Sequence, residues 1–212
     1  YMFRKNWHYD PTSQDRAAIL DEMNEILECL AGYRREGKIR HLGLSNESAW
    51  GTAQWLRVAE DRELPRMASI QNEYSLLCRL FDTDLAELAH NEDVGLLSFS
   101  PLACGLLTGK YRADSPPPKG SRRDINADLG GRTTPRLWPA IHAYQALADE
   151  YGFDLGQMAL AWCMRRPFMT SVIFGATSLP QLENSLCATQ LKLTHEIMAR
   201  IDETHRTLPM PF

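Results

Sequence analysis

The regular alternation of short apolar segments with longer amphipathic ones limits the folds open to this chain. Apolar runs typical of buried strands occupy residues 39–45, 67–71, 94–99 and 170–174, and segments with helix periodicity separate them. The first three runs return every roughly 27 residues, a spacing typical of parallel strands joined by right-handed crossovers. The alternation therefore predicts an α/β protein with a parallel sheet.

Helices are predicted where apolar residues return every three or four positions. The first begins after Thr12 and Asp15, which have capping-box spacing, and it ends at Gly37. Pro180 is expected as the first residue of a short helix. The remaining helices are expected over residues 50–59, 82–90, 135–151, 155–165 and 194–208.

The chain has 212 residues, 44% of them apolar, which suits a single domain over residues 1–212. A barrel of eight alternating strands and helices needs about 250 residues, so four strand–helix units amount to half of one. Residues 112–134, rich in proline and glycine, interrupt the alternation. Loops of this length are typical of lids and binding loops, and a disordered insertion is the alternative.

Composition excludes several classes of protein. A net charge of −4 provides no basic face for nucleic acid. No segment approaches the about 18 uninterrupted apolar residues of a membrane span. Five cysteines without a CxxC pair indicate reduced thiols in a cytoplasmic protein, and the histidines lack the spacing of metal ligands.

Polar residues follow the predicted strands at the edge where parallel-sheet proteins bind ligands. Ser45, Asn46 and Gln71 supply the donors and acceptors that a planar carboxamide needs, and Phe99 is placed to stack on a flat ring. The alternative is that Ser45 and Asn46 cap the following helix and that Phe99 belongs to the core.

Small residues follow the fourth strand, at 175–178, and Gln181 lies one helical turn further on. Such a turn lets backbone N–H groups and a helix N-terminus approach a phosphate, although a plain turn with an N-cap explains it equally well. Two nucleotide motifs are rejected. Residues 105–111 resemble a phosphate-binding loop, but their glycines are one residue too close, and no GxGxxG follows a strand.

Four segments resemble, in order, successive blocks of the aldo-keto reductase family: residues 37–46, 69–77, 99–111 and 175–182. The nearest branch is the bacterial Tas-like one, which is related to potassium-channel beta subunits. The resemblance implies a (β/α)8 TIM barrel, of which this chain supplies roughly the last four strand–helix units. It also implies NADP(H) at the carboxyl ends of the strands and a small-molecule carbonyl substrate.

The resemblance also assigns roles to single residues. Ser45, Asn46 and Gln71 would hold the nicotinamide carboxamide, and Phe99 would take the stacking position. The pyrophosphate loop would comprise Ser100, Leu102, Gly105 and Lys110, and the 2′-phosphate would be approached by Gly175, Thr177 and Gln181. Asn184 and Ser185 stand where relatives often carry Glu-Asn, which leaves the preference for NADP over NAD open.

The catalytic Tyr, Lys, Asp and His of the family lie on the first half of its barrel, so the resemblance implies a C-terminal half that lacks them and is inactive alone. Tyr1, Lys5, His8 and Asp10 supply the same residue types, but within ten residues, and are interpreted as a surface loop.

A half barrel leaves two sheet edges open, so self-association or pairing with the missing half is expected. The alternative functions are a non-catalytic nucleotide-binding or interaction module, like the channel-associated relatives, and an unrelated parallel α/β protein.

Overall fold

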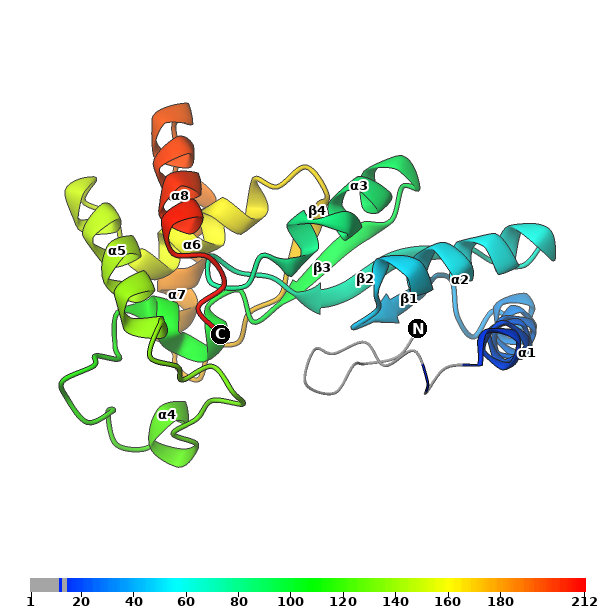
Figure 1. Cartoon of the computed structure of the whole chain (residues 1–212), viewed down its shortest axis with the longest axis horizontal. Coiled ribbons are helices and arrows are strands. Elements are labelled where there is room, and N and C mark those ends of the chain that lie inside the picture. Colours follow the sequence, from blue (N-terminus) through cyan, green and yellow to red (C-terminus); the bar gives the residue numbers. More distant parts are fainter. Residues whose placement is uncertain (1–11, 13–14) are drawn as a thin grey trace. The chain divides into compact units, whose positions relative to one another are not determined.

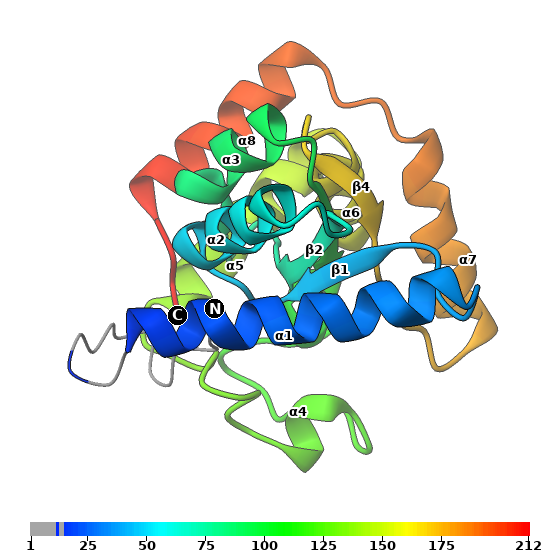
Figure 2. The same ribbon diagram turned by 90° about the vertical axis from the view of Figure 1, so that its right-hand side faces the viewer.

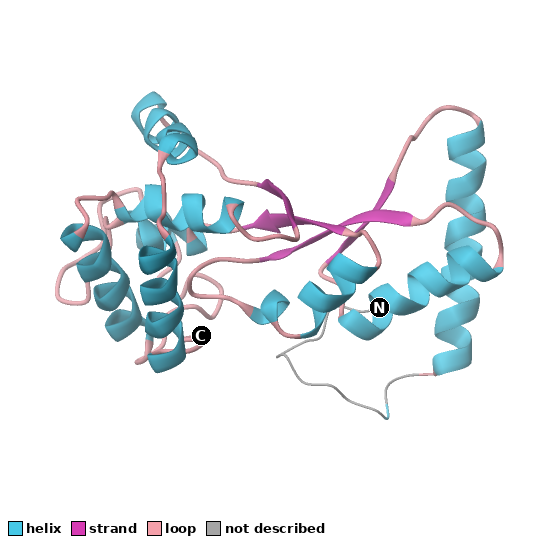
Figure 3. Cartoon of the chain, turned by 90° about the horizontal axis from the view of Figure 1, so that it is seen from above, coloured by secondary structure: helices cyan, strands magenta, loops and turns pink. Residues whose placement is uncertain are grey.

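The computed structural model describes residue 12 and residues 15–212. It contains two compact units (Figure 1): unit 1 comprises the residues up to Asn72 together with Phe81–Leu97, and unit 2 comprises Glu73–Leu80 and Ser98–Phe212. This division into two units does not test whether residues 1–212 form a single domain, so the single domain stays a prediction. Both units combine strands with helices (Figure 3).

Four strands form one parallel sheet within the described residues, as the alternation predicts. They are β1 (Leu42–Ser45), β2 (Met67–Glu73), β3 (Gly95–Phe99) and β4 (Met169–Val172), in the order β1-β2-β3-β4. Strand order therefore follows chain order, which is the arrangement that successive right-handed crossovers produce. The assignment of these strands to the last four units of a barrel stays a prediction.

The first helix, α1 (Arg16–Arg35), begins one turn later than the predicted capping box requires. Asp15 is itself the N-cap, because its carboxylate accepts the N–H groups of Ala17 and Ala18 over 2.9 and 3.2 Å. The prediction that Thr12 and Asp15 form a capping box was therefore wrong: the acidic side chain caps the helix directly.

The end of α1 confirms the predicted stop at Gly37, which adopts a left-handed φ of 74°. The Gly37 N–H donates to the Arg34 carbonyl and the Lys38 N–H to the Tyr33 carbonyl, each over 3.0 Å. This pair of bonds is a Schellman motif, which needs a residue that tolerates positive φ.

Unit 1 packs α1 against α2 (Ala49–Asp61), and α2 contacts α3 (Asp84–Asn91) (Figure 2). Met23 and Leu27, one turn apart on α1, are completely buried. Burying one stripe of each helix in this way supplies most of the stability of an amphipathic helix.

Unit 2 is organised around α6 (Leu155–Met164), eight of whose ten residues are buried. The helix contacts α5 (Leu137–Glu150), β4 and α7 (Leu179–Cys187), and α5 also contacts α8 (His195–Thr207). A helix that is apolar on all sides has to lie inside its unit, and the sequence of α6 meets that requirement.

The remaining elements are short: η3 (Leu80–Asp82), η4 (Ala103–Thr108), α4 (Arg122–Ile125) and η5 (Ala188–Gln190). The loop 112–134, expected to have little structure of its own, thus contains a helical turn. Pro180 is the second residue of α7 and not the first, because the N-cap is Ser178. Among the described residues, the structure has no helix both long and apolar enough to span a membrane.

Candidate functional site

The three polar residues expected at the ends of the first two strands lie side by side in unit 1. Ser45 and Gln71 are register partners in the β1–β2 ladder. Beyond the ladder, the main-chain N–H of Asn46 donates to the Gln71 carbonyl over 2.9 Å, and the Asn46 side-chain amide donates to Ser45 Oγ over 3.2 Å. Ser45 and Asn46 are exposed and Gln71 is half-buried, so a ligand has access to them.

Asn46 ends the strand because its backbone adopts a left-handed φ of 54°. Asparagine tolerates this region better than most residues with a side chain. The turn directs the chain from β1 into α2, where Ser48 is the N-cap and its hydroxyl accepts the Gly51 N–H over 3.1 Å. The helix cap is therefore Ser48, and the alternative in which Ser45 and Asn46 serve as the cap is wrong.

The chain that follows β3 turns through several strained residues. Phe99 ends the strand half-buried, and φ is positive at Ser100 (51°), Cys104 (58°) and Gly105 (93°). Left-handed backbone at residues other than glycine costs free energy and concentrates at functional sites. The predicted pyrophosphate loop is therefore a tightly wound segment.

Two predicted residues of this loop approach each other closely. A Cβ added to Gly105 would lie 2.9 Å from Lys110 Cε, so the lysine side chain passes over the glycine. The Leu102 carbonyl accepts the Gly105 N–H over 2.8 Å and closes the turn. Lys110 is an exposed residue, and its ammonium nitrogen lies 5.0 Å from the centre of the Tyr111 ring.

The start of α7 brings together two residues of the predicted phosphate group. Gln181 Oε1 accepts both the Thr177 N–H, over 2.9 Å, and the Thr177 hydroxyl, over 3.0 Å. Both residues and Gly175 are exposed. Asn184 instead faces α6: its amide donates to Asp154 Oδ1 over 3.1 Å.

The predicted site residues therefore form separate groups. Ser45, Asn46 and Gln71 belong to unit 1, and the residues from Phe99 onwards belong to unit 2. Their convergence on one cofactor stays a prediction. Tyr1, Lys5, His8 and Asp10 lie outside the described residues.

An ion pair that sequence analysis missed anchors the end of the loop 112–134. Arg132 donates from Nε and Nη2 to the two carboxylate oxygens of Glu73, over 3.0 and 2.6 Å, and from Nη1 to the Leu129 carbonyl over 2.8 Å. The side chains of Arg132 and Glu73 are only 16% and 10% exposed. Two-point pairing of guanidinium with carboxylate fixes both side chains.

The same region sets the chemistry of a buried thiol. Burial raises the pKa of Cys78 to about 12, and the negative charge of Glu73 adds to the rise, whereas a backbone hydrogen bond at Leu80 and the charge of Arg132 oppose it. A thiol in such surroundings stays protonated and unreactive. Of the five cysteines, all of them free, Cys29 and Cys187 are exposed.

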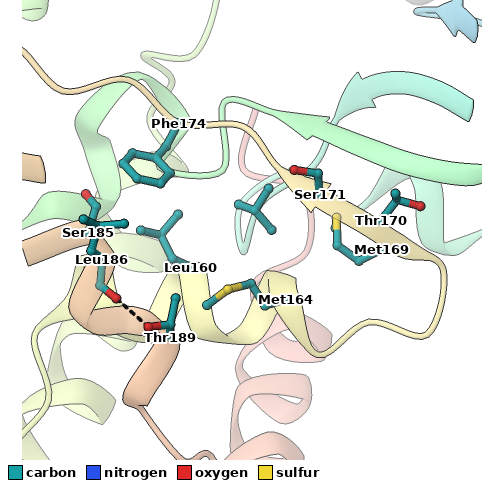
Figure 4. Close-up of a pocket in the computed structure, with 10 residues that line it drawn as sticks. Leu160, Met164, Met169, Thr170, Ser171, Phe174, Ser185, Leu186 and Thr189 are labelled. Atoms are coloured by element: carbon teal, nitrogen blue, oxygen red, sulfur yellow. Dashed lines mark hydrogen bonds between the residues drawn. The ribbon is translucent and has the colours of Figure 1, made fainter.

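A hollow of about 430 Å³ lies between α6, β4 and α7 in unit 2 (Figure 4). Its ten lining residues include no ionisable side chain: Leu160, Met164, Met169, Thr170, Ser171, Val172, Phe174, Ser185, Leu186 and Thr189. The Thr189 hydroxyl is already bonded to the Leu186 carbonyl over 2.8 Å. The hollow therefore lacks the groups needed for acid–base chemistry.

A family match over nearly the whole chain accompanies two structural features, which are the strand order β1-β2-β3-β4 and the cluster of Ser45, Asn46 and Gln71. The chain belongs to the aldo/keto reductase family, whose model matches residues 6–206. The match confirms the resemblance. Because it runs through most of the chain, it does not support the expectation that only a C-terminal half of the family is present.

Single proteins that are similar to this chain are consistent with membership of this family. Protein tas of Escherichia coli (strain K12) is 39% identical over 99% of this chain and 63% of its own length. An aldo-keto reductase of Babesia bovis is 32% identical over 94% of the chain and 74% of its own length. The L-glyceraldehyde 3-phosphate reductase of Escherichia coli O157:H7 is 31% identical over 85% of the chain and 54% of its own length. The chain thus spans less than two thirds of the tas relative.

Proposed function

We propose that the chain is the nicotinamide-binding portion of an NADP(H)-dependent reductase of aldehydes or ketones, in the Tas-like branch. Family membership supports an aldo-keto oxidoreductase. The observation that carries the proposal is the cluster of Ser45, Asn46 and Gln71, which presents side-chain donors and acceptors together at one accessible strand edge.

The chemistry of this cluster fits a carboxamide. The primary amide of nicotinamide carries two N–H donors and one carbonyl acceptor in a single plane. The amide side chains of Asn46 and Gln71 each offer both kinds of group. The Ser45 hydroxyl accepts one bond from Asn46 and retains a donor hydrogen and a second lone pair for a ligand.

Residues of unit 2 would hold the phosphates. Lys110 brings an exposed positive charge beside the strained turn at Gly105. The start of α7, where Thr177 and Gln181 meet, provides a helix N-terminus suited to an anion. When bound, the cofactor supplies hydride to the carbonyl carbon of the substrate.

The remaining elements of the proposal concern the whole protein. The four blocks of sequence would form the last four strand–helix units of the family barrel. The loop 112–134, fixed at one end by the Arg132–Glu73 ion pair, would serve as a lid. A cytoplasmic location and association with a second copy or with the rest of a barrel belong to the same proposal.

Titration of the chain with NADPH, followed by nucleotide fluorescence, tests the proposal. Gln71→Ala removes one side-chain amide from the cluster and is expected to weaken binding about tenfold, since it removes one or two hydrogen bonds. Gln190→Ala is the matched control, because Gln190 is an exposed glutamine in unit 2 at η5. Lack of NADPH binding by the unmodified chain, or equal effects of the two variants, would overturn the proposal.

A further inference from the structure

A side-chain amide next to the candidate site is bonded to the main chain of the loop that carries Asn46. Asn72 Nδ2 donates to the Glu47 carbonyl over 3.0 Å, and Asn72 Oδ1 accepts the Glu47 N–H over 3.2 Å. Both residues belong to unit 1 and are 25 positions apart. Asn72 therefore satisfies the donor and the acceptor of one residue simultaneously.

This pairing takes over where the regular ladder stops. The ladder pairs Ser45 with Gln71, and the Asn46 N–H still donates to the Gln71 carbonyl over 2.9 Å. Asn46 then leaves the extended region with φ of 54°, so the next main-chain pair cannot form in the regular way. The Asn72 amide supplies the missing donor and acceptor in place of a peptide group.

The Glu47 side chain also holds the loop. Glu47 is 7% exposed, and its carboxylate accepts the Ser48 N–H over 2.7 Å and the Trp55 indole N–H over 3.2 Å. Since Trp55 lies in α2, the carboxylate ties the loop to the helix that follows it. Glu47 is thus fixed both through its main chain and through its side chain.

We infer that Asn72 is a positioning residue for the nicotinamide carboxamide. By fixing the main chain of Glu47, it keeps the preceding residue, Asn46, in its left-handed conformation and so keeps the Asn46 amide and the Ser45 hydroxyl at the strand edge. This inference rests on the proposed function. Without Asn72 the loop regains freedom that binding has to remove, and affinity falls.

Calorimetric titration of the full chain with two nucleotides tests the role of Asn72. The nucleotides are NADP⁺ and 2′-phospho-ADP-ribose, which lacks only the nicotinamide. Asn72→Leu removes both hydrogen bonds at similar side-chain volume. It is expected to weaken NADP⁺ binding about tenfold and to leave 2′-phospho-ADP-ribose binding within about twofold.

The matched control is Asn91→Ala. Asn91 also donates from its amide to a main-chain carbonyl, that of Glu87 over 2.9 Å, but at the end of α3. This variant is expected to bind both nucleotides as the unmodified chain does.

A second variant keeps the test decisive where Asn72→Leu fails to fold. Asn72→Asp retains the shape of the side chain but loses the donor to the Glu47 carbonyl while it is ionised. Protonation restores a donor, so NADP⁺ binding by this variant is expected to strengthen from pH 7 to pH 4, close to the ordinary aspartate pKa of about 3.9, relative to the unmodified chain.

The outcomes distinguish failure of the positioning role of Asn72 from failure of the proposed function. Unchanged NADP⁺ affinity in Asn72→Leu, or equal weakening toward both nucleotides, overturns the positioning role while the proposed function stands. A pH response of Asn72→Asp identical to that of the unmodified chain also overturns it. Failure of the unmodified chain to bind NADP⁺ removes the proposed function, and the inference with it.

Discussion

Replacing Arg132 by methionine is expected to destabilise unit 2 strongly and to release the loop 112–134. The substitution keeps much of the aliphatic stem but removes both hydrogen bonds to Glu73 and the bond to the Leu129 carbonyl. It also removes the guanidinium that lies 5.7 Å from the centre of the Phe212 ring.

The magnitude follows from the burial of the partner. Glu73 is only 10% exposed, so loss of Arg132 leaves a poorly hydrated carboxylate without its counter-charge. Breaking a buried pair by removing one partner costs about 3–5 kcal/mol, and because Arg132 retains 16% exposure we expect about 3 kcal/mol. Glu73→Gln in the same chain removes the stranded charge, so the double variant is expected to lose less than the sum of the single losses.

Urea unfolding of the two single variants and the double variant measures the coupling, and limited trypsin digestion measures release of the loop. Cleavage at Lys119, Arg122 and Arg123 is expected to accelerate in Arg132→Met. The control is Arg206→Met, since Arg206 pairs with Glu203 on the exposed face of α8 and is expected to change neither readout. Unaltered stability and unaltered cleavage in Arg132→Met would refute the account of this ion pair.

Three further predictions concern single residues. Gly105→Ala is expected to cost about 1–2 kcal/mol in urea unfolding, because φ is 93° there and the new Cβ would crowd Lys110. By contrast, Gly32→Ala within α1, where a Cβ meets nothing within 4 Å, is expected to stabilise the chain by about 0.5–1 kcal/mol, and a loss would contradict the helix geometry. The folded pKa of Cys78 is raised from 9.0 to about 12, so its contribution to stability is complete below pH 9 and is lost as pH rises towards 12. The unmodified chain is expected to lose on the order of 1 kcal/mol more than Cys78→Ala between pH 8 and pH 10, and parallel pH profiles would contradict this.

Local patterns in the sequence were enough to predict most of the elements. The apolar run at 94–99 and the stop at Gly37 correspond to β3 and to the Schellman motif, because each depends on neighbouring residues alone. The capping arrangement of α1 did not follow from the sequence, because the spacing of Thr12 and Asp15 fits a capping box, whereas in the structure Asp15 alone is the N-cap that accepts the helix N–H groups.

The neighbouring positions of Ser45 and Gln71 also followed from the sequence, because parallel strands place their carboxyl ends at one edge. The side-chain pairings that fix the residues around the site could not be predicted from the sequence. Arg132 lies 59 residues from Glu73, and Asn72 lies 25 residues from Glu47. Neither pair has a periodic signature, because each depends on the tertiary fold.

The most direct test of the central claim compares two nucleotides that differ only at the carboxamide. In the 3-acetylpyridine analogue of NADP⁺ a methyl group replaces the amide nitrogen, so both donor hydrogens are lost. We expect the chain to bind NADP⁺ about tenfold more tightly than this analogue, and Gln71→Ala to reduce the difference. Equal affinity of the unmodified chain for the two nucleotides would contradict a carboxamide site at Ser45, Asn46 and Gln71.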